Sequence, residues 1–267
     1  MQNILEKIVN QKKEDLIEVK KKNSLTFIDQ KIKSIDNFLD FKKTLIDQER
    51  ENCVSLIAEI KKSSPSAGVI VKKFDHIKIA EIYSNNGATC LSVLTEEKFF
   101  LGNLNYIEEI KKKIKIPILA KDFFIDPYQV SYSKSFGCDC ILIILSALSR
   151  KQSDEIYEEA LKNKLSVIVE IHNEEEAEYA LKYEKAIIGI NNRDLKNLEI
   201  SLDNSVKMHK KLVSHKSPLV SESGIKNKID AQYIYDKTGI KNFLIGESLL
   251  SSGETGKLIK EILSINL

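Results

Sequence analysis

Short apolar runs alternate with amphipathic segments along most of the chain, from residue 54 onward. Several runs are continuously apolar, such as ILIIL at 141–145 and AIIGI at 186–190, which is typical of parallel strands buried on both faces. Between the runs, apolar residues recur at helical spacing. We therefore predict eight strands, at residues 54–60, 89–94, 116–121, 140–145, 166–171, 186–190, 218–221 and 242–245.

A helical pattern follows each predicted strand, and this alternation favours parallel strands joined by crossover helices. An open, doubly wound sheet would show the same alternation, but it would gather its polar site residues near one switch point. Here polar residues follow strands along the whole chain, and only a closed barrel brings all strand ends to one mouth. We predict an α/β fold, a single (β/α)8 TIM barrel, with helices at 77–85, 104–113, 127–136, 152–163, 174–183, 205–212, 228–237 and 256–263.

The segment before the first strand has a different pattern. Its apolar residues recur at rough helical spacing, and lysines occupy the other side. We expect residues 1–48 to form an N-terminal helical extension that caps one end of the barrel. Residues 49–267 would then form the barrel as one domain, a usual length for this fold.

Composition and charge narrow the classes of partner. The 42% hydrophobic and 30% charged residues are ordinary for a globular protein. The 41 basic and 39 acidic residues are interleaved, so they create no basic field for nucleic acid. No stretch has the length of a membrane span, and the N-terminus lacks the apolar core of a signal peptide. We expect a cytoplasmic protein that is a monomer or a weak homo-oligomer and binds neither nucleic acid nor membrane.

The cysteines and histidines do not indicate a metal or a cofactor. The four cysteines border or lie within apolar runs, so we expect small buried thiols rather than disulfides or metal ligands. The four histidines lack metal-ligand spacing, and we expect His172 to be structural. GETGK at 253–257 lacks the first Gly and the final Ser or Thr of a phosphate-binding P-loop, and there is no dinucleotide fingerprint. We predict no metal and no cofactor.

Charged side chains stand where apolar runs end. Glu59 and Lys61 share one face of the first strand, because side chains at i and i+2 point the same way. Buried charges without partners are costly, so each of these two charges needs either the other one or a charged ligand as its partner. Lys121 and Glu170 end two further runs. Such residues are often only solvated or paired, but burial of Glu170 would raise its pKa toward neutrality, as a general base or proton carrier requires.

Seven sequence blocks resemble the indole-3-glycerol phosphate synthase family of tryptophan biosynthesis, in the family's order and across nearly the whole chain. The blocks are VSLIAEIKKSSPSAG (54–68), LSVLTEEKFFLGNL (91–104), PILAKDFFIDPYQV (117–130), VIVEIHNEEEA (167–177), IIGINNRDLKNLEI (187–200), LVSESGI (219–225) and FLIGESLL (243–250).

This resemblance implies a carbon–carbon lyase acting on a small phosphorylated substrate. The reaction would close the ring of 1-(2-carboxyphenylamino)-1-deoxyribulose 5-phosphate, with loss of carbon dioxide and water, to give indole-3-glycerol phosphate. The family's pattern assigns Lys121 as the general acid at the ketone oxygen, Glu170 as the general base, and Lys61 as the cation that binds the substrate carboxylate.

The remaining polar residues are expected to position the substrate. The resemblance implies that Glu59, Asn191 and Glu222 bind the sugar hydroxyls and the ring nitrogen. Arg193 stands two residues beyond Asn191, so it could face the same side, and its family counterpart assists around the aromatic carboxylate. Phe100 is a plausible apolar wall for the aromatic ring, whereas Leu145 is better explained as core.

Phosphate recognition needs backbone N–H groups at the starts of loops and helices, without any basic side chain. Barrel enzymes often build this site after the seventh and eighth strands. In this chain those loops contain Ser223 and Gly224, then Gly246 and Glu247, with Ser64 available from the first loop. We expect Glu247 to offer its N–H group while its carboxylate points away.

Two features depart from the family's pattern, and two other functions remain open. Ala120 stands where the family often has Arg, and Leu101 stands where it has a polar residue. The first alternative is another sugar-phosphate isomerase or lyase, with Lys121 as a Schiff-base nucleophile. The second is an inactive barrel that acts as a binding partner.

Overall fold

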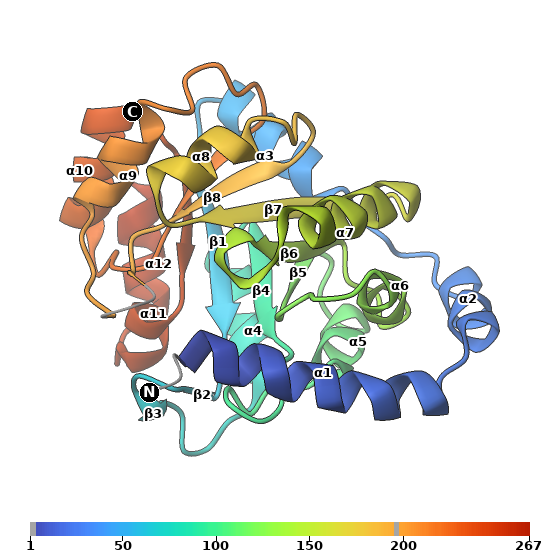
Figure 1. Cartoon of the computed structure of the whole chain (residues 1–267). Helices are drawn as coiled ribbons and strands as arrows, with labels where there is room; N and C mark the ends of the chain where they lie inside the picture. The colour runs from blue at the N-terminus through green and yellow to red at the C-terminus, as the bar shows by residue number, and fades with distance from the viewer. Residues whose placement is uncertain (1–3, 195–197) are drawn as a thin grey trace.

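The computed structural model describes residues 4–194 and 198–267, and its centre is a closed barrel of eight parallel strands (Figure 1). Neighbours around the barrel follow the order β1-β10-β9-β8-β7-β6-β5-β4, and β4 pairs with β1 to close the ring. The predicted TIM barrel is confirmed, and each predicted strand matches an observed one within two residues. The strands are β1 Ser55–Ile60, β4 Cys90–Leu94, β5 Ile118–Lys121, β6 Cys140–Ile144, β7 Ser166–Ile171, β8 Ile187–Asn191, β9 Leu219–Glu222 and β10 Asn242–Ile245.

Helices surround the barrel, and an apolar layer fills the space between helices and strands. These helices form where the sequence predicts them, with bounds that differ by at most three residues. Side-chain caps fix several of their starts, such as Asp75 at Lys78 N–H and Asn227 at Asp230 N–H. The helices are α4 His76–Asn85, α5 Asn105–Lys111, α6 Tyr128–Lys134, α7 Arg150–Lys162, α8 Glu174–Ala180, α9 Asp203–His209, α10 Lys228–Thr238 and α12 Thr255–Leu263.

Strand alternation divides each strand between the outer layer and the barrel interior. In β1, Leu56, Ala58 and Ile60 pack in the outer layer, while Ile57 packs in a second apolar cluster inside the barrel. Glu59, two residues after Ile57, therefore faces the interior at the carboxyl end of the strand. Three other strands also have an interior apolar residue followed, two residues later, by a charged residue that lines the cavity. These pairs are Leu119 and Lys121, Ile168 and Glu170, and Val220 and Glu222.

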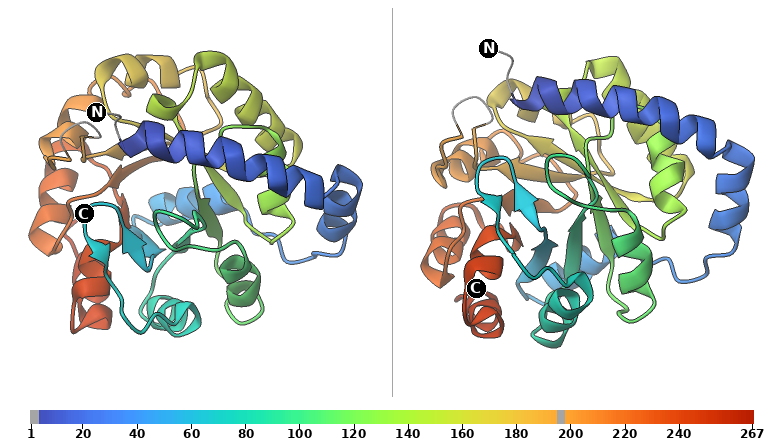
Figure 2. Two further views of the ribbon diagram at one scale, coloured as in Figure 1. Left: turned by 60° about the horizontal axis from the view of Figure 1, so that its bottom comes forward. Right: turned by 90° about the horizontal axis from the view of Figure 1, so that it is seen from below.

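The helices before the barrel lie at both of its ends. In α3 (Phe41–Arg50), Phe41 and Leu45 are fully buried in the inner cluster and close the amino end of the barrel. Helix α1 (Ile4–Lys22) lies across the opposite end, to which the strands point (Figures 1 and 2). Lys12 of α1 pairs with Asp122 at 2.7 Å. Helix α2 (Leu25–Lys33) packs beside α6.

Three short elements escaped the sequence prediction. They are a hairpin in the first loop, formed by β2 (Ser63–Ser64) and β3 (Gly68–Val69), the 3-10 turn η1 (Leu145–Ala147) and helix α11 (Glu247–Ser251). Elements of two to five residues are too short to show a period.

Three other expectations can be compared with the fold. All four cysteines are free, but Cys53 is exposed rather than buried because it lies in the turn between α3 and β1. Within the described ranges, no helix combines the length and apolarity needed to cross a membrane. The domain boundary at residue 48 stays a prediction, and residues 1–3 of the predicted extension lie outside the described residues.

Candidate active site

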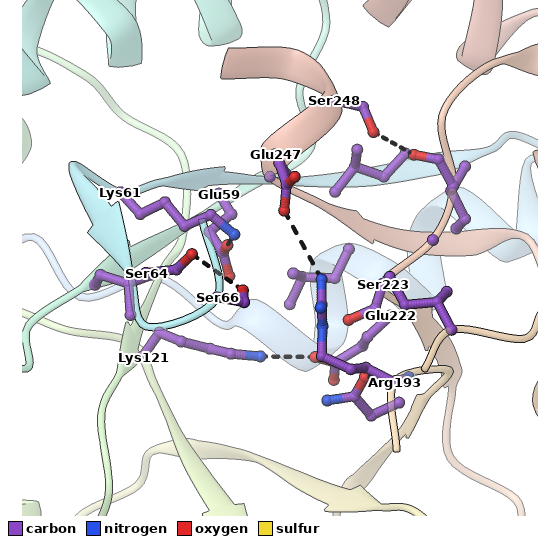
Figure 3. A pocket seen from close by; sticks show the side chains of 18 of the residues that line it. Glu59, Lys61, Ser64, Ser66, Lys121, Arg193, Glu222, Ser223, Glu247 and Ser248 are labelled. Atoms are coloured by element: carbon purple, nitrogen blue, oxygen red, sulfur yellow. Dashed lines mark hydrogen bonds and ion pairs between the residues drawn. The ribbon is translucent and has the colours of Figure 1, made fainter. Parts of the chain in front are cut away.

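A cavity of about 870 Å³ opens at the carboxyl ends of the strands (Figure 3). All thirteen residues that the sequence predicts for the site line this cavity, although they come from loops and strands far apart in the chain. Leu145 is not among the lining residues and packs in the outer apolar layer, as expected for core. The thirteen are Glu59, Lys61, Ser64, Phe100, Lys121, Glu170, Asn191, Arg193, Glu222, Ser223, Gly224, Gly246 and Glu247.

Lys121 stands at the centre of the charged groups. Its Nζ lies 2.7 Å from Glu222 Oε2 and 3.1 Å from Glu170 Oε2. Burial opposes the charge on Lys121, but the combined field of Glu222, Glu170 and Glu59 outweighs it and raises the lysine's pKa above its ordinary value. Lys121 is therefore an ammonium, held by carboxylates from two other strands.

Glu170 is surrounded by groups that stabilise its charge. Its Oε1 accepts a hydrogen bond from Asn191 Nδ2 at 3.1 Å and lies 3.2 Å from His172 Nε2. Burial alone would raise the pKa of Glu170, but Lys121, His172 and Asn191 outweigh burial and lower that pKa. The sequence-based expectation of a raised pKa for Glu170 is wrong, because partners from β5 and β8 reach this carboxylate.

The carboxyl group with a near-neutral pKa is Glu222. Burial, with the nearby charges of Glu170 and Glu59, raises the pKa of Glu222 to about 7 against the opposing effect of Lys121. Among the described residues, Glu222 Oε1 has no hydrogen-bond partner. It occupies space left by Gly189 of β8, where an added Cβ would stand 2.0 Å from it. Glu222 thus has the near-neutral pKa that the sequence argument expected of Glu170.

Glu59 and Lys61 form a second pair on the same face of the first strand, as the alternation predicts. Lys61 Nζ lies 2.7 Å from Glu59 Oε1. Burial opposes the charge on Glu59, but Lys61 and Lys121 outweigh it and lower the carboxyl's pKa. A Cβ on Gly246 would stand 2.4 Å from Glu59 Oε1, so a glycine after β10 leaves room for this carboxylate.

The loops after β9 and β10 form one rim of the cavity. Ser223 and Gly224 both adopt left-handed backbone conformations, with φ of 68° and 83°. Asn192 anchors this loop by donating from Nδ2 to Ser223 O at 3.0 Å. Ser248, at the start of α11, donates from Oγ to Ile225 O at 2.8 Å and ties the two loops together. The backbone of this rim is therefore fixed without a ligand.

Arg193 and Glu247 face each other across the cavity at 3.8 Å, as Figure 3 shows. The Glu247 carboxylate is therefore within ion-pair reach of the Arg193 guanidinium, and its orientation relative to a bound phosphate stays a prediction. Arg193 follows Asn191, whose Oδ1 accepts the Arg193 N–H at 3.0 Å and fixes the turn between them.

The apolar wall comes partly from residues that the sequence analysis missed. Phe100 lines the cavity, and the buried carboxylate of Glu96 fixes its loop by accepting hydrogen bonds from three backbone N–H groups, including that of Phe100 at 3.0 Å. Ile4, Leu5 and Ile8 of α1 also line the cavity. The sequence analysis predicted a helical cap over one end of the barrel, but not that these three side chains line the cavity.

His172 is another residue whose position was missed. The sequence contained a signal for it, because His172 comes two residues after Glu170, directly after β7, and continued alternation puts both side chains on one face.

A closed barrel of parallel strands with charged groups converging at its carboxyl end defines a (β/α)8-barrel protein with the site arrangement of barrel enzymes. The family model described as indole-3-glycerol phosphate synthase matches residues 5–262. A relative of that name in Alkaliphilus metalliredigens is 40% identical over 261 residues, covering 98% of both chains. One in Desulforamulus reducens is 38% identical over 259 residues, covering 97% of this chain and 96% of the relative. The chain belongs to the indole-3-glycerol phosphate synthase family.

Solved structures support the fold alone. A tryptophan synthase alpha subunit from Legionella pneumophila superposes with a TM-score of 0.62 at 13% identity, covering 83% of this chain and 96% of that one. Phosphoribosylanthranilate isomerase from Thermotoga maritima has a TM-score of 0.55 at 11% identity, with coverage of 78% and 96%.

Proposed function

We propose that this protein is an active indole-3-glycerol phosphate synthase that converts 1-(2-carboxyphenylamino)-1-deoxyribulose 5-phosphate to indole-3-glycerol phosphate, carbon dioxide and water. The observation that carries the proposal is the convergence of Lys61, Lys121 and Glu170 on one cavity in a chain of this family. These three groups match a substrate with a carboxylate, a ketone and protons that must be removed.

Substrate binding would use opposite sides of the cavity. The phosphate would lie on the rim formed by Ser223, Gly224, Gly246 and Glu247, where backbone N–H groups bind an anion, with Ser64 beside it. The aromatic ring would pack on the apolar wall that includes Phe100. Lys61 would bind the carboxylate of the substrate's aromatic ring. To do so, Lys61 would leave its ion pair with Glu59. This pose folds the extended substrate so that its ring carbon meets the ketone.

Ring closure would begin when the ring carbon that carries the carboxylate attacks the ketone carbon. A carbon–carbon bond forms, and the ketone oxygen takes a proton from Lys121. Loss of carbon dioxide then returns its bonding electrons to the ring and restores aromaticity. Holding both reacting centres in one geometry can supply about 7 to 11 kcal/mol of barrier reduction in favourable intramolecular cases.

Dehydration would complete the reaction. Lys121, reprotonated from solvent, gives a proton to the hydroxyl, which leaves as water, and Glu170 takes a proton from the new ring. Glu170 is a carboxylate while Lys121 is charged, and it becomes a stronger base once Lys121 has given up its proton. Glu59, Asn191 and Glu222 would hold the sugar hydroxyls and the ring nitrogen, and Arg193 would assist at the aromatic carboxylate.

The direct test is incubation of the purified chain with the carboxyphenylamino sugar phosphate, with indole fluorescence and carbon dioxide release followed together. We expect both signals to rise in a one-to-one ratio. Their absence, in protein that binds the substrate, would favour an inactive barrel that acts as a binding partner.

Borohydride trapping separates this proposal from a Schiff-base lyase. A Schiff-base lysine must be a neutral amine before it attacks, whereas the raised pKa of Lys121 keeps it an ammonium. We expect borohydride with a ketose phosphate to leave no adduct on Lys121. A covalent adduct there, detected by mass spectrometry, would support the lyase instead.

A further inference from the structure

His172 stands against Glu170 on the side away from Lys121. It follows β7, two residues after Glu170, and its side chain is only 7% exposed. Its Nε2 lies 3.2 Å from Glu170 Oε1, and its Nδ1 lies 3.3 Å from Glu176 Oε2 in α8. Nδ1 is hydrogen-bonded to Glu176, whereas the contact of Nε2 with Glu170 is an ion pair without hydrogen-bond geometry. The imidazole ring thus lies between a carboxylate of the cavity and a carboxylate near the protein surface.

Further hydrogen bonds fix the outer carboxylate. Glu176 Oε2 accepts the backbone N–H of His172 at 2.8 Å, and Oε1 accepts Asn173 Nδ2 at 2.7 Å. Asn173 Oδ1 in turn caps α8 by accepting the Glu176 N–H at 2.9 Å. Because Glu176 is held at both oxygens, the ring that faces it has a defined orientation.

The charges around Glu170 explain why such a ring matters. Lys121 from β5 is the other cation beside Glu170, but it also serves Glu222 from β9 at the shorter distance of 2.7 Å. Glu222 and Glu59 from β1 are like charges that oppose a carboxylate at Glu170. When Lys121 gives up its proton, Glu170 loses that cation as well. His172 is then the cation that remains within ion-pair distance of Glu170 among the described residues.

The ring carries the charge that this role needs. Burial opposes an imidazolium, but Glu170 and Glu176 outweigh burial and raise the pKa of His172 to about 9. At neutral pH the ring is therefore positively charged.

We propose that His172 is a positioning residue for the reaction proposed above: its imidazolium, held by Glu176, keeps Glu170 in the carboxylate form and directed at the substrate. The inference rests on the proposed function for its catalytic meaning, whereas the contact between the two side chains is independent of it. It differs from a merely structural histidine in one measurable respect, which is how activity depends on pH.

The first experiment compares His172→Gln with the wild type in kcat/KM from the lowest pH at which both are folded up to pH 8.5. Without the imidazolium, Glu170 protonates more readily, so the acidic limb of the profile should move up by about one pH unit. We expect about a tenfold loss on the acidic limb, below the apparent pKa of both proteins, and less than about threefold at pH 8. His209→Gln is the matched control, because His209 lies on α9 and is not among the residues that line the cavity.

An equal loss at every pH would show that His172 only supports the fold, and an unchanged profile would show that it does nothing for Glu170. Either result overturns the inference.

The second experiment does not depend on turnover. Titration of the histidine imidazoles by NMR should give His172 a pKa well above that of an exposed histidine in the wild type. Glu170→Gln should lower this pKa by about one pH unit, because coupling between two charges is reciprocal. Ordinary titration of His172, or no response to Glu170→Gln, would contradict the inference. If the wild type fails to make indole-3-glycerol phosphate but the titration behaves as expected, the proposed function fails and the charge coupling stands.

Discussion

The barrel buries a lysine beside a carboxylate at each of its two ends, and the two contacts differ in how fully their atoms are satisfied. At the amino end, Lys111 of α5 pairs at 2.6 Å with Asp139, which precedes β6. Asp139 also accepts the N–H groups of Leu39 at 2.7 Å and Ile118 at 2.8 Å, and Lys111 donates to Asn37 O at 3.2 Å. This contact holds the segment before α3 against the barrel and leaves its charges matched one to one.

At the carboxyl end, Lys121 is shared between Glu170 and Glu222, and one buried oxygen of Glu222 has no hydrogen-bond partner among the described residues. These groups face a cavity, whereas neither Lys111 nor Asp139 lines it. Burial of an ion pair is therefore weak evidence for a site. Excess charge and an unsatisfied atom that face open space are the features that indicate chemistry.

Lys121→Met is expected to have the largest effect and tests whether the contact at the carboxyl end serves the reaction. We expect kcat to fall about 10³-fold, the usual range for loss of a general acid, while KM changes much less. The measurement is steady-state indole fluorescence, with circular dichroism to show that the variant is folded. Equal turnover by the variant and the wild type would remove Lys121 from its proposed role.

The matched change at the other end is Lys111→Met. It leaves Asp139 buried without its cation, so the free energy of unfolding should fall by about 3 kcal/mol. Urea unfolding measures this loss, and kcat per folded molecule should stay at the wild-type value. A drop in kcat without a loss of stability would mean that the two ends are coupled and that the comparison is wrong.

The smallest expected effect sharpens the role of Glu222. In Gly189→Ala the new Cβ would collide with Glu222 Oε1, so the carboxylate must shift from its position beside Lys121. Displacements of this size typically reduce turnover up to about 100-fold. Gly253→Ala is the control, because no atom lies within 4 Å of a Cβ at that position. If both variants keep wild-type kcat, the placement of Glu222 does not matter for the reaction.

The fold was predictable because its strands are buried on both faces and are separated by regular helices. A continuous apolar run such as 141–145, followed by a helical pattern, is typical of a buried strand and not of a helix face or a loop. The structure confirms the strands predicted in this way. The hairpin of β2 and β3 and the short helix α11 were not predictable, since tight loop geometry and tertiary contacts rather than periodicity determine them.

The candidate site was predictable where one strand determines the geometry. Glu59 and Lys61 share a face by alternation alone, and their pair is observed. The prediction failed where several strands act together. The pKa of Glu170 depends on Lys121 and Asn191, which lie on other strands, and no local pattern contains that information. The sequence analysis placed the extension over one end of the barrel but missed that α1 lines the cavity, because an amphipathic stripe does not show which end it covers or which of its side chains face the site.

The position of α3 has a consequence for how the protein is made. Phe41 and Leu45 belong to the inner apolar cluster, which contains side chains from all eight barrel strands. Their binding site is therefore complete only when β10 has paired with β1. The ribosome synthesises α3 before any of those strands. During synthesis, nearly two hundred further residues must therefore be added after α3 before the barrel can close around Phe41 and Leu45.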